Sequence, residues 1–516
     1  MRTIMLTSLL FMGCDPFGDL SGHGWSNIQD ELWDPEVVTV DDGVYVRLPH
    51  ARKLARVQDS GNYKIVDLKG AHPQKIVAGP AMDRVLVFAE WAICSDPSED
   101  IVLESDCNYA DLTTGRELVI VQDGKRVAVT DVPSHMNTLR FTPNGQMAAA
   151  FFTYDSSEDL TLDGVMDPTV VSFVDLSDGS TQSISAGTTP REVLFSDDGA
   201  RALVLSQSEV VVVDMENFNI DITYPLTLDK DEEIDPSGAV LSPDGRYALI
   251  SITGTSDLFQ LDLEVVSVDL EALDSVPATL ASDATTQTTV VTYGSMRAVD
   301  VITEHGFIER SEVELDEAAP DVQMADGFAV LYNDSGTGRD IYRLDLENLA
   351  VTEYVAANPV HSLQLTDSAN HAVAILRPED ASGSGLDGYQ DSRWGLAIAD
   401  LQTDEIASLV LESEPVGLEL VEDGDSAFAL LLLDGVESLI QVDLNSPGAV
   451  EEIDLSSSAA GIDAAPNGQF TISHTDAMGQ LSFLNPESGK LKSVSGFGSI
   501  NILTDHPLPR RASDKE

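Results

Sequence analysis

The stretch Leu241 to Ser251, LSPDGRYALIS, decides the fold because it is the clearest copy of a pattern that returns along most of the chain. Its centre, Pro243-Asp244-Gly245, predicts a tight turn in which glycine takes a positive φ. An apolar segment ends at Leu241 and another begins at Tyr247, so the pattern predicts a β-hairpin. Clear copies are FTPNGQMAAAFF (Phe141 to Phe152), FSDDGARALVLS (Phe195 to Ser206), LVEDGDSAFALL (Leu420 to Leu431) and APNGQFTIS (Ala465 to Ser473). Looser copies are Met324 to Tyr332, Leu365 to Leu376 and Ala78 to Ala89.

A second pattern accompanies the first: an apolar segment that ends in Asp-Leu or a relative, followed by a polar turn. Its copies are Asn108 to Gly115, Val171 to Gly179, Val210 to Asn217, Val265 to Leu273, Ile341 to Leu349, Leu396 to Asp404, Leu439 to Gly448 and Leu481 to Gly489. With a weaker outer segment after each copy, the unit has four strands and a period of about 40 to 60 residues, as a β-propeller blade requires.

These repeats resemble those of the bacterial WD40-like and YVTN-type β-propellers, whose units carry a [FL]SPDG turn followed by a VDL strand. The resemblance covers roughly residues 37 to 503 and implies an all-β fold. Eight paired patterns between His72 and Leu503 predict about eight four-stranded blades, with seven or nine as the alternatives. Residues 288–318 lack both patterns and are an insertion or an eroded blade. We expect the ring to be closed by the N- and C-terminal strands, which removes open sheet edges.

The chain is strongly acidic. It has 88 Asp and Glu against 28 Lys and Arg, a net charge of -60, and 43% hydrophobic residues, which fits a globular protein. Such a charge argues against nucleic acid as a partner, because phosphate binding needs clustered basic residues. The acidity either keeps the protein soluble, as in a salty habitat, or serves a cation or a basic partner.

The N-terminus, MRTIMLTSLLFMGC, has one Arg and an apolar run that is too short to span a membrane. It resembles a bacterial lipoprotein signal, which implies cleavage after residue 13 and lipidation of Cys14. The alternatives are a plain secretory signal and a structural N-terminus. Residues 14–36 then form a flexible tether, 37–504 the propeller and 505–516 a disordered tail. The expected location is the bacterial cell envelope, with a lipid anchor as the only membrane attachment; secretion is the alternative.

The remaining cysteines, Cys94 and Cys107, bracket an acidic loop. An even pair in an exported chain favours a disulfide. Two free buried thiols are the alternative.

Long acidic loops between the second and third strands of the units are expected on one face of the propeller, where binding sites of rigid scaffolds are commonly built. In one of them, Asp155, Asp159, Asp163 and Asp167 surround Gly164. Carboxylate oxygens suit calcium, although the spacing differs from that of an EF-hand. The set is a calcium site or a group of solvated loop acids. The sequence requires no cofactor, and calcium is the single cofactor for which it offers candidate ligands.

Three histidines, His72, His135 and His361, lie just before or within expected innermost strands. Imidazoles at a central channel bind metals or transfer protons, and the alternative is a structural role. The chain has no G-x-S-x-G elbow, no H-E-x-x-H and no phosphate loop, so it offers no catalytic residue.

The sequence therefore predicts an envelope-anchored propeller lipoprotein that serves as a scaffold through its acidic loops, with an envelope protein or a small ligand as partner. Some propellers of the resembled group are lactonases, which implies a hydrolase with a site in the central channel as one alternative. A purely structural surface protein is the other.

Overall fold

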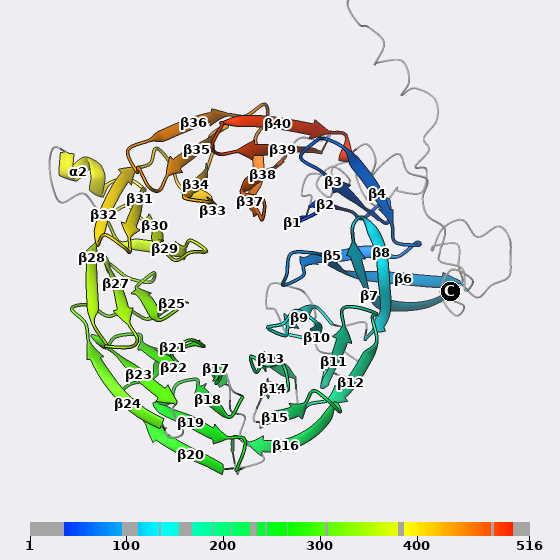
Figure 1. The fold of residues 1–516 in the computed structure, drawn as a ribbon, viewed down its shortest axis with the longest axis vertical. Helices are drawn as coiled ribbons and strands as arrows, with labels where there is room; N and C mark the ends of the chain where they lie inside the picture. Colours follow the sequence, from blue (N-terminus) through cyan, green and yellow to red (C-terminus); the bar gives the residue numbers. More distant parts are fainter. Residues whose placement is uncertain are drawn as a thin grey trace, which may run out of the picture.

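The computed structural model describes residues 36–94, 112–133, 136–153, 168–187, 189–207, 209–227, 234, 236–242, 245–265, 267–304, 308–379, 386–475 and 479–498. These residues form a β-propeller of ten four-stranded antiparallel sheets arranged in a ring (Figure 1). The sheets are blades 1 to 10 in chain order. The all-β class and the propeller architecture are thus confirmed, whereas the predicted number of about eight blades is wrong, as are the alternatives of seven and nine.

Each blade consists of four consecutive strands. The first strand lies nearest the centre of the ring and the fourth lies at the outer rim (Figure 1). The innermost strands are β1 (Val37–Val40), β5 (His72–Ala78), β9 (Thr138–Phe141), β13 (Pro190–Phe195), β17 (Pro236–Leu241), β21 (Pro277–Asp283), β25 (Asp321–Ala325), β29 (Val360–Leu365), β33 (Pro415–Asp423) and β37 (Ala459–Ala465). The second strands are β2 (Gly43–Leu48), β6 (Val85–Cys94), β10 (Met147–Phe151), β14 (Arg201–Ser206), β18 (Tyr247–Ile252), β22 (Thr288–Tyr293), β26 (Phe328–Tyr332), β30 (His371–Leu376), β34 (Ser426–Leu433) and β38 (Gln469–His474).

The two outer positions of every blade complete the sheets. The third strands are β3 (Lys53–Val57), β7 (Leu112–Gln122), β11 (Val170–Asp175), β15 (Glu209–Asp214), β19 (Asp257–Asp262), β23 (Ala298–Glu304), β27 (Asp340–Asp345), β31 (Gly395–Asp400), β35 (Ser438–Asp443) and β39 (Gln480–Asn485). The outermost strands are β4 (Tyr63–Asp67), β8 (Lys125–Val132), β12 (Thr181–Ser185), β16 (Asn219–Pro225), β20 (Ser267–Ala272), β24 (Ile308–Glu314), β28 (Val351–Val355), β32 (Glu405–Val410), β36 (Val450–Asp454) and β40 (Lys490–Ser495). A short helix, α2 (Leu386–Asp391), lies between β30 and β31.

Two blades account for the difference in number. Residues 37–67, expected to supply closing strands, form blade 1 on their own. Residues 277–314, which include most of the segment without either pattern, form blade 6. Because every sheet in the described part of the chain consists of four consecutive strands, closure through a sheet shared by the two ends is not seen.

The apolar core lies between the blades. Neighbouring residues of a second strand point to opposite faces of the sheet, so they enter different clusters. In β18, Ala248 and Ile250 pack toward blade 4, and Leu249 packs toward blade 6. The first and last blades also share such a cluster, with Val44 of β2 beside Phe483 of β39. Non-directional burial between sheets thus fixes the order of the blades.

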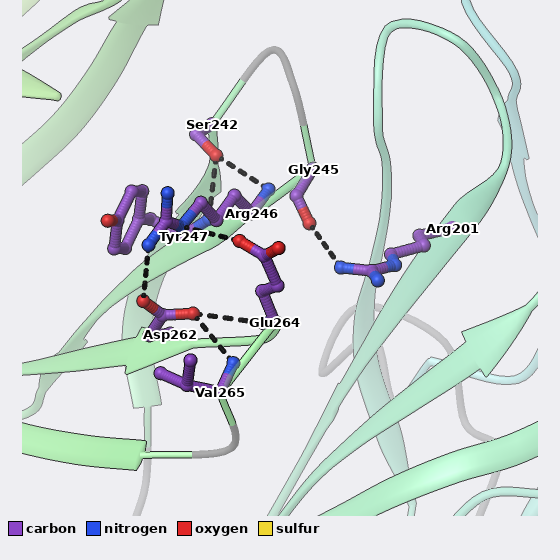
Figure 2. A network of polar contacts seen from close by, with 8 residues as sticks. All are labelled: Arg201, Ser242, Gly245, Arg246, Tyr247, Asp262, Glu264 and Val265. Carbon is purple, nitrogen blue, oxygen red and sulfur yellow. Dashed lines mark hydrogen bonds and ion pairs between the residues drawn. The ribbon is translucent and has the colours of Figure 1, made fainter. Parts of the chain in front are cut away.

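In blades 3, 4 and 5, the first hairpin is stabilised by a hydroxyl placed just before its turn, as Figure 2 shows for blade 5. Ser242 Oγ accepts the backbone N–H of Arg246 at 3.1 Å and that of Tyr247 at 2.7 Å. Ser196 in blade 4 and Thr142 in blade 3 accept the corresponding N–H groups, each at 3.0 Å. The Ser or Thr of the repeated sequence therefore holds the hairpin together.

In the Asp-Leu pair at the end of a third strand, the aspartate stabilises the turn and the leucine is buried. Asp262 Oδ1 accepts the N–H of Glu264 at 2.9 Å, which stabilises the turn, while the side chain of Leu263 is buried. Arg246 Nη2 lies 3.2 Å from Asp262 Oδ2, so the two sequence patterns meet at one end of the blade (Figure 2). Pairs of the same kind are Asp175-Leu176, Asp345-Leu346, Asp400-Leu401 and Asp443-Leu444.

The longer segments expected between second and third strands occupy that place in blades 2, 3, 7 and 8. Most of their residues lie outside the described part of the chain.

Candidate functional site

A cavity of about 560 Å³ lies beside the inner strands of blades 10, 1 and 2. Its polar wall belongs to blade 10 and carries Asp463 of β37 with Thr471 and Ser473 of β38. Its apolar wall is formed mainly by β1 and β5, and includes Val37 and Val77. The volume falls in the range of small-molecule sites, and the mixture of apolar walls with a few polar groups is typical of them.

The cavity exists because blade 10 presents small residues toward blade 1. In blade 9, the corresponding face of the second strand carries Leu430 and Leu432, which fill the junction with blade 10. In blade 10, the matching positions carry the smaller residues Thr471 and Ser473. Apolar packing between blades 10 and 1 therefore begins farther from the centre, leaving space at the inner strands.

Two carboxyl groups meet at the inner strands of blades 9 and 10. Burial, and then the nearby charge of Asp463, raise the pKa of Glu419 in β33 to about 7. Burial also raises the pKa of Asp463. The N–H of Ala464 opposes both shifts, since a hydrogen bond to the charged form lowers a carboxyl pKa. Near neutral pH, Glu419 is therefore a mixture of acid and carboxylate.

Glu419 occupies the inner-strand position that glutamine occupies in blades 7 and 8. Gln323 in β25 joins blade 8, with its Nε2 donating to Leu363 O at 2.5 Å and its Oε1 accepting the Leu365 N–H at 3.1 Å. Gln364 in β29 donates to Leu418 O of blade 9 at 3.3 Å. An amide both donates and accepts, whereas a carboxylate only accepts. Protonated Glu419 can both donate and accept a hydrogen bond, as the amides of Gln323 and Gln364 do.

The hydroxyl of Thr471 is the unusual polar group of the cavity. Thr471 is only 2% exposed, and its Oγ1 has no hydrogen-bond partner among the described residues. It lies directly opposite Asp463 in the register of β37 and β38. The corresponding partners of Gln364 and Glu419 are Val373 and Leu430. The fold thus accepts an apolar residue here, while a buried hydroxyl without a partner costs stability.

Thr39 of β1 completes the polar end of the cavity. Its N–H and hydroxyl approach Asp463 closely enough to lower the pKa of that carboxyl, although the hydroxyl does not complete a hydrogen bond. Asp463 therefore faces polar groups from both blade 10 and blade 1.

A second, smaller cavity of about 250 Å³ lies at the first hairpin turns of blades 10 and 1. Thr39 and Thr471 line both cavities. The smaller one also carries Asp41, Asp42 and Asp59. Burial raises the pKa of Asp42, and its contacts with Tyr45 and Arg56 act in the opposite direction.

The histidines predicted for the channel are not brought together. His72 begins β5 of blade 2, where burial and then Arg52 lower its pKa, and Gln74 Nε2 donates to its Nδ1 at 3.1 Å. His361 lies in β29 of blade 8, exposed beside the Trp394 ring at 5.4 Å between centroids. The two strands are on opposite sides of the ring (Figure 1). His135 lies outside the described residues.

The other predicted sites remain predictions. The set Asp155, Asp159, Asp163 and Asp167 lies outside the described residues, as do Cys14 and Cys107. Of Cys94, the structure describes only the backbone, at the end of β6. In the described part of the chain, no three His, Cys, Asp or Glu side chains are grouped so that they could hold a metal ion. Nor does that part contain a helix of the length and apolarity needed to cross a membrane.

Sequence reasoning missed Glu419, Asp463, Thr39 and Thr471. A signal for the two acids was present, because Glu419 stands between leucines and Asp463 among small and apolar residues in expected inner strands. Comparison of these strands with the glutamine-bearing ones of blades 7 and 8 would have marked both positions. Thr39 had no such signal, since its neighbour in space is more than four hundred residues away in the chain.

No protein-family model matches the chain, and no curated protein sequence matches it. Among solved structures, it is similar to a eukaryotic initiation factor, at 11% identity and TM-score 0.47, over 79% of this chain and 95% of that one. It is also similar to the dihydro-heme d1 dehydrogenase NirN in complex with DHE, at 14% identity and TM-score 0.42, over 75% of this chain and 74% of that one. A third is the hydrazine synthase of Kuenenia stuttgartiensis, at 13% identity and TM-score 0.34, over 66% of this chain and 99% of that one. Likenesses this distant carry no argument about function.

Proposed function

We propose that this protein is a binding propeller that holds a small molecule in the larger cavity, between blades 10, 1 and 2. The observation that carries the proposal is the Thr471 hydroxyl, which is buried on the cavity wall with no hydrogen-bond partner among the described residues. A ligand that accepted from or donated to this hydroxyl would remove the cost of leaving it unpaired. The adjacent Asp463 would fix the orientation of the ligand.

The test is a thermal-shift screen of a chemically diverse small-molecule library against the full chain, followed by calorimetric titration of each hit. We expect hits whose affinity falls at least tenfold in Asp463→Asn and several-fold in Thr471→Val. Asp221→Asn, at an exposed position of β16 in blade 4, is the matched control and leaves the affinity unchanged. A screen without hits, or hits that bind all variants equally, would overturn the proposal.

The proposal includes an envelope location and kinship with WD40-like and YVTN-type propellers. Both rest on sequence: the repeats, and the apolar N-terminal run that ends at Cys14. Metabolic labelling with palmitate should mark the wild-type chain and not Cys14→Ser. Equal labelling of the two would remove the lipid anchor from the proposal.

Hydrolysis is the second candidate function, and the pKa of Glu419 favours it. A carboxyl with a pKa of about 7 is suited to general acid–base catalysis near neutral pH. Ionised Glu419 would take the proton of a water molecule that attacks a lactone or ester carbonyl, and would return it to the alkoxide oxygen that leaves when the acyl C–O bond breaks. A panel of lactones and nitrophenyl esters tests this candidate. Hydrolysis should rise as the pH passes about 7 and be lost in Glu419→Gln; absence of hydrolysis across the panel would remove the candidate.

A further inference from the structure

The two cavities share Thr39 and Thr471 in their walls, and the charged side chains of both walls are negative. The ionisable side chains that line them are all acids: Asp463 in the larger cavity, and Asp41, Asp42 and Asp59 in the smaller one. An anionic ligand would meet these carboxylates and the field of a chain with a net charge of -60. A cation is favoured by the same field.

The polar groups of the larger cavity form a compact set of acceptors. The Asp463 carboxylate lies between Thr471, opposite it on β38, and Thr39 on β1. Each hydroxyl oxygen has acceptor lone pairs, and an ammonium group has three N–H donors. One carboxylate and two hydroxyls therefore match the donors and the charge of a single ammonium group. Thr471 supplies an oxygen that no described residue uses.

Apart from Thr39, the wall that blades 1 and 2 contribute to the larger cavity is apolar. Val37 of β1, Val77 of β5 and Met82, which follows β5, lie on the wall contributed by blades 1 and 2. An inorganic cation would leave this surface in contact with water, whereas the hydrocarbon part of an organic cation would cover it. Burial of apolar surface contributes about 25 cal/mol per Å².

From these features, and resting on the proposed function, we infer that the ligand is an organic ammonium ion with an apolar body. Its nitrogen lies at Asp463, between the hydroxyls of Thr39 and Thr471, and its hydrocarbon part packs against Val37, Val77 and Met82.

Three probes of equal length and different charge test the inference: hexylammonium, hexan-1-ol and hexanoate, titrated into the full chain by calorimetry at constant ionic strength. We expect hexylammonium to bind at one site, at least tenfold more tightly than hexan-1-ol, with no binding of hexanoate. Asp463→Asn should weaken hexylammonium at least tenfold, and Thr471→Val should weaken it several-fold. Asp221→Asn should leave it unchanged.

Other outcomes separate this inference from the function on which it rests. If hexan-1-ol or hexanoate binds as tightly as hexylammonium, and Thr471→Val weakens it, the cavity binds ligands but the ammonium class is wrong. If hexylammonium binds wild type and Asp463→Asn equally, it is held by the general negative surface and the inference fails. If Asp463→Asn does not fold, Thr471→Val decides alone, and an unchanged hexylammonium affinity in that variant overturns the inference.

Discussion

Thr471 lies opposite Asp463 across β38 and β37, at the place where Val373 faces Gln364 and Leu430 faces Glu419. A buried hydroxyl without a partner thus occupies a position that the same fold fills with hydrocarbon in two neighbouring blades. Replacing it with valine keeps the shape of the side chain and removes the unpaired group.

We therefore predict that Thr471→Val raises the free energy of unfolding by roughly 0.5 to 1.5 kcal/mol, measured by urea denaturation. The matched control is Thr289→Val in β22, because the Thr289 hydroxyl lies 2.7 Å from Ser282 Oγ and is also buried. Loss of that bond should destabilise the protein. Destabilisation by Thr471→Val of the same size would show that Thr471 serves the fold rather than a ligand.

Glu419 should make stability depend on pH. Its pKa is about 7 in the folded protein and has an ordinary value of 4.5. Below 4.5 the carboxyl is protonated in both states; between 4.5 and 7 only the folded state keeps the proton, so stability falls as the pH rises through this window. Between pH 5 and pH 8, wild type should lose roughly 1 to 3 kcal/mol more than Glu419→Gln.

The measurement is urea unfolding of both proteins at several pH values from 5 to 8. Glu405→Gln, at an exposed position of β32, is the control and should follow wild type. Parallel pH curves for wild type and Glu419→Gln would contradict the shifted pKa of Glu419.

The turn hydroxyl of blade 5 should matter for stability. Ser242→Ala removes the acceptor of the Arg246 and Tyr247 N–H groups, and Ser242 is only 3% exposed. The expected cost is about 1 to 2 kcal/mol in urea unfolding, since buried donors lose their partner. Ser267→Ala, on the exposed outer strand of the same blade, should change little. Equal effects of the two substitutions would count against a role of the hydroxyl in the hairpin.

Blade 6 depends on a buried ion pair. Asp300 of β23 is 0% exposed, lies 2.9 Å from Arg310 Nε and accepts a hydrogen bond from the Tyr293 hydroxyl. Arg310→Leu leaves this carboxylate without its cation, and should cost about 3 to 5 kcal/mol. The double variant Asp300→Leu/Arg310→Leu should recover part of the loss. A single variant within 1 kcal/mol of wild type would contradict this account.

Blade 6 could not be recognised as a blade from the sequence because its first turn lacks glycine. In blade 5, the positive φ of the first turn belongs to Gly245, at 67°; in blade 6, Gln287 takes a φ of 52°. Blade 6 therefore keeps the positive φ of the turn without the glycine that would predict it. The sequence also predicts a third strand that ends at Asp269 in blade 5. Asp269 lies in the outer strand β20, and the third strand ends at Asp262.

The propeller itself could be predicted, since hydrogen bonds within one blade depend on residues close together in the chain. The cavity could not. It arises where Thr39 of β1 meets Asp463 of β37, and it depends on Thr471 and Ser473 being smaller than Leu430 and Leu432, which fill the junction between blades 9 and 10. Local patterns show which residues form strands, but they do not show what a distant strand leaves unfilled.

Blades 1 and 10 are neighbours in space that no peptide segment joins directly, and their contact rests on side chains such as Val44 and Phe483. A molecule bound between them would hold the first blade to the last. Ligand present at a hundred times its dissociation constant would add about 2.7 kcal/mol to the folded state. Much of this energy would resist separation of the first blade from the last, so amide hydrogen exchange in β1 and β37 would report occupancy.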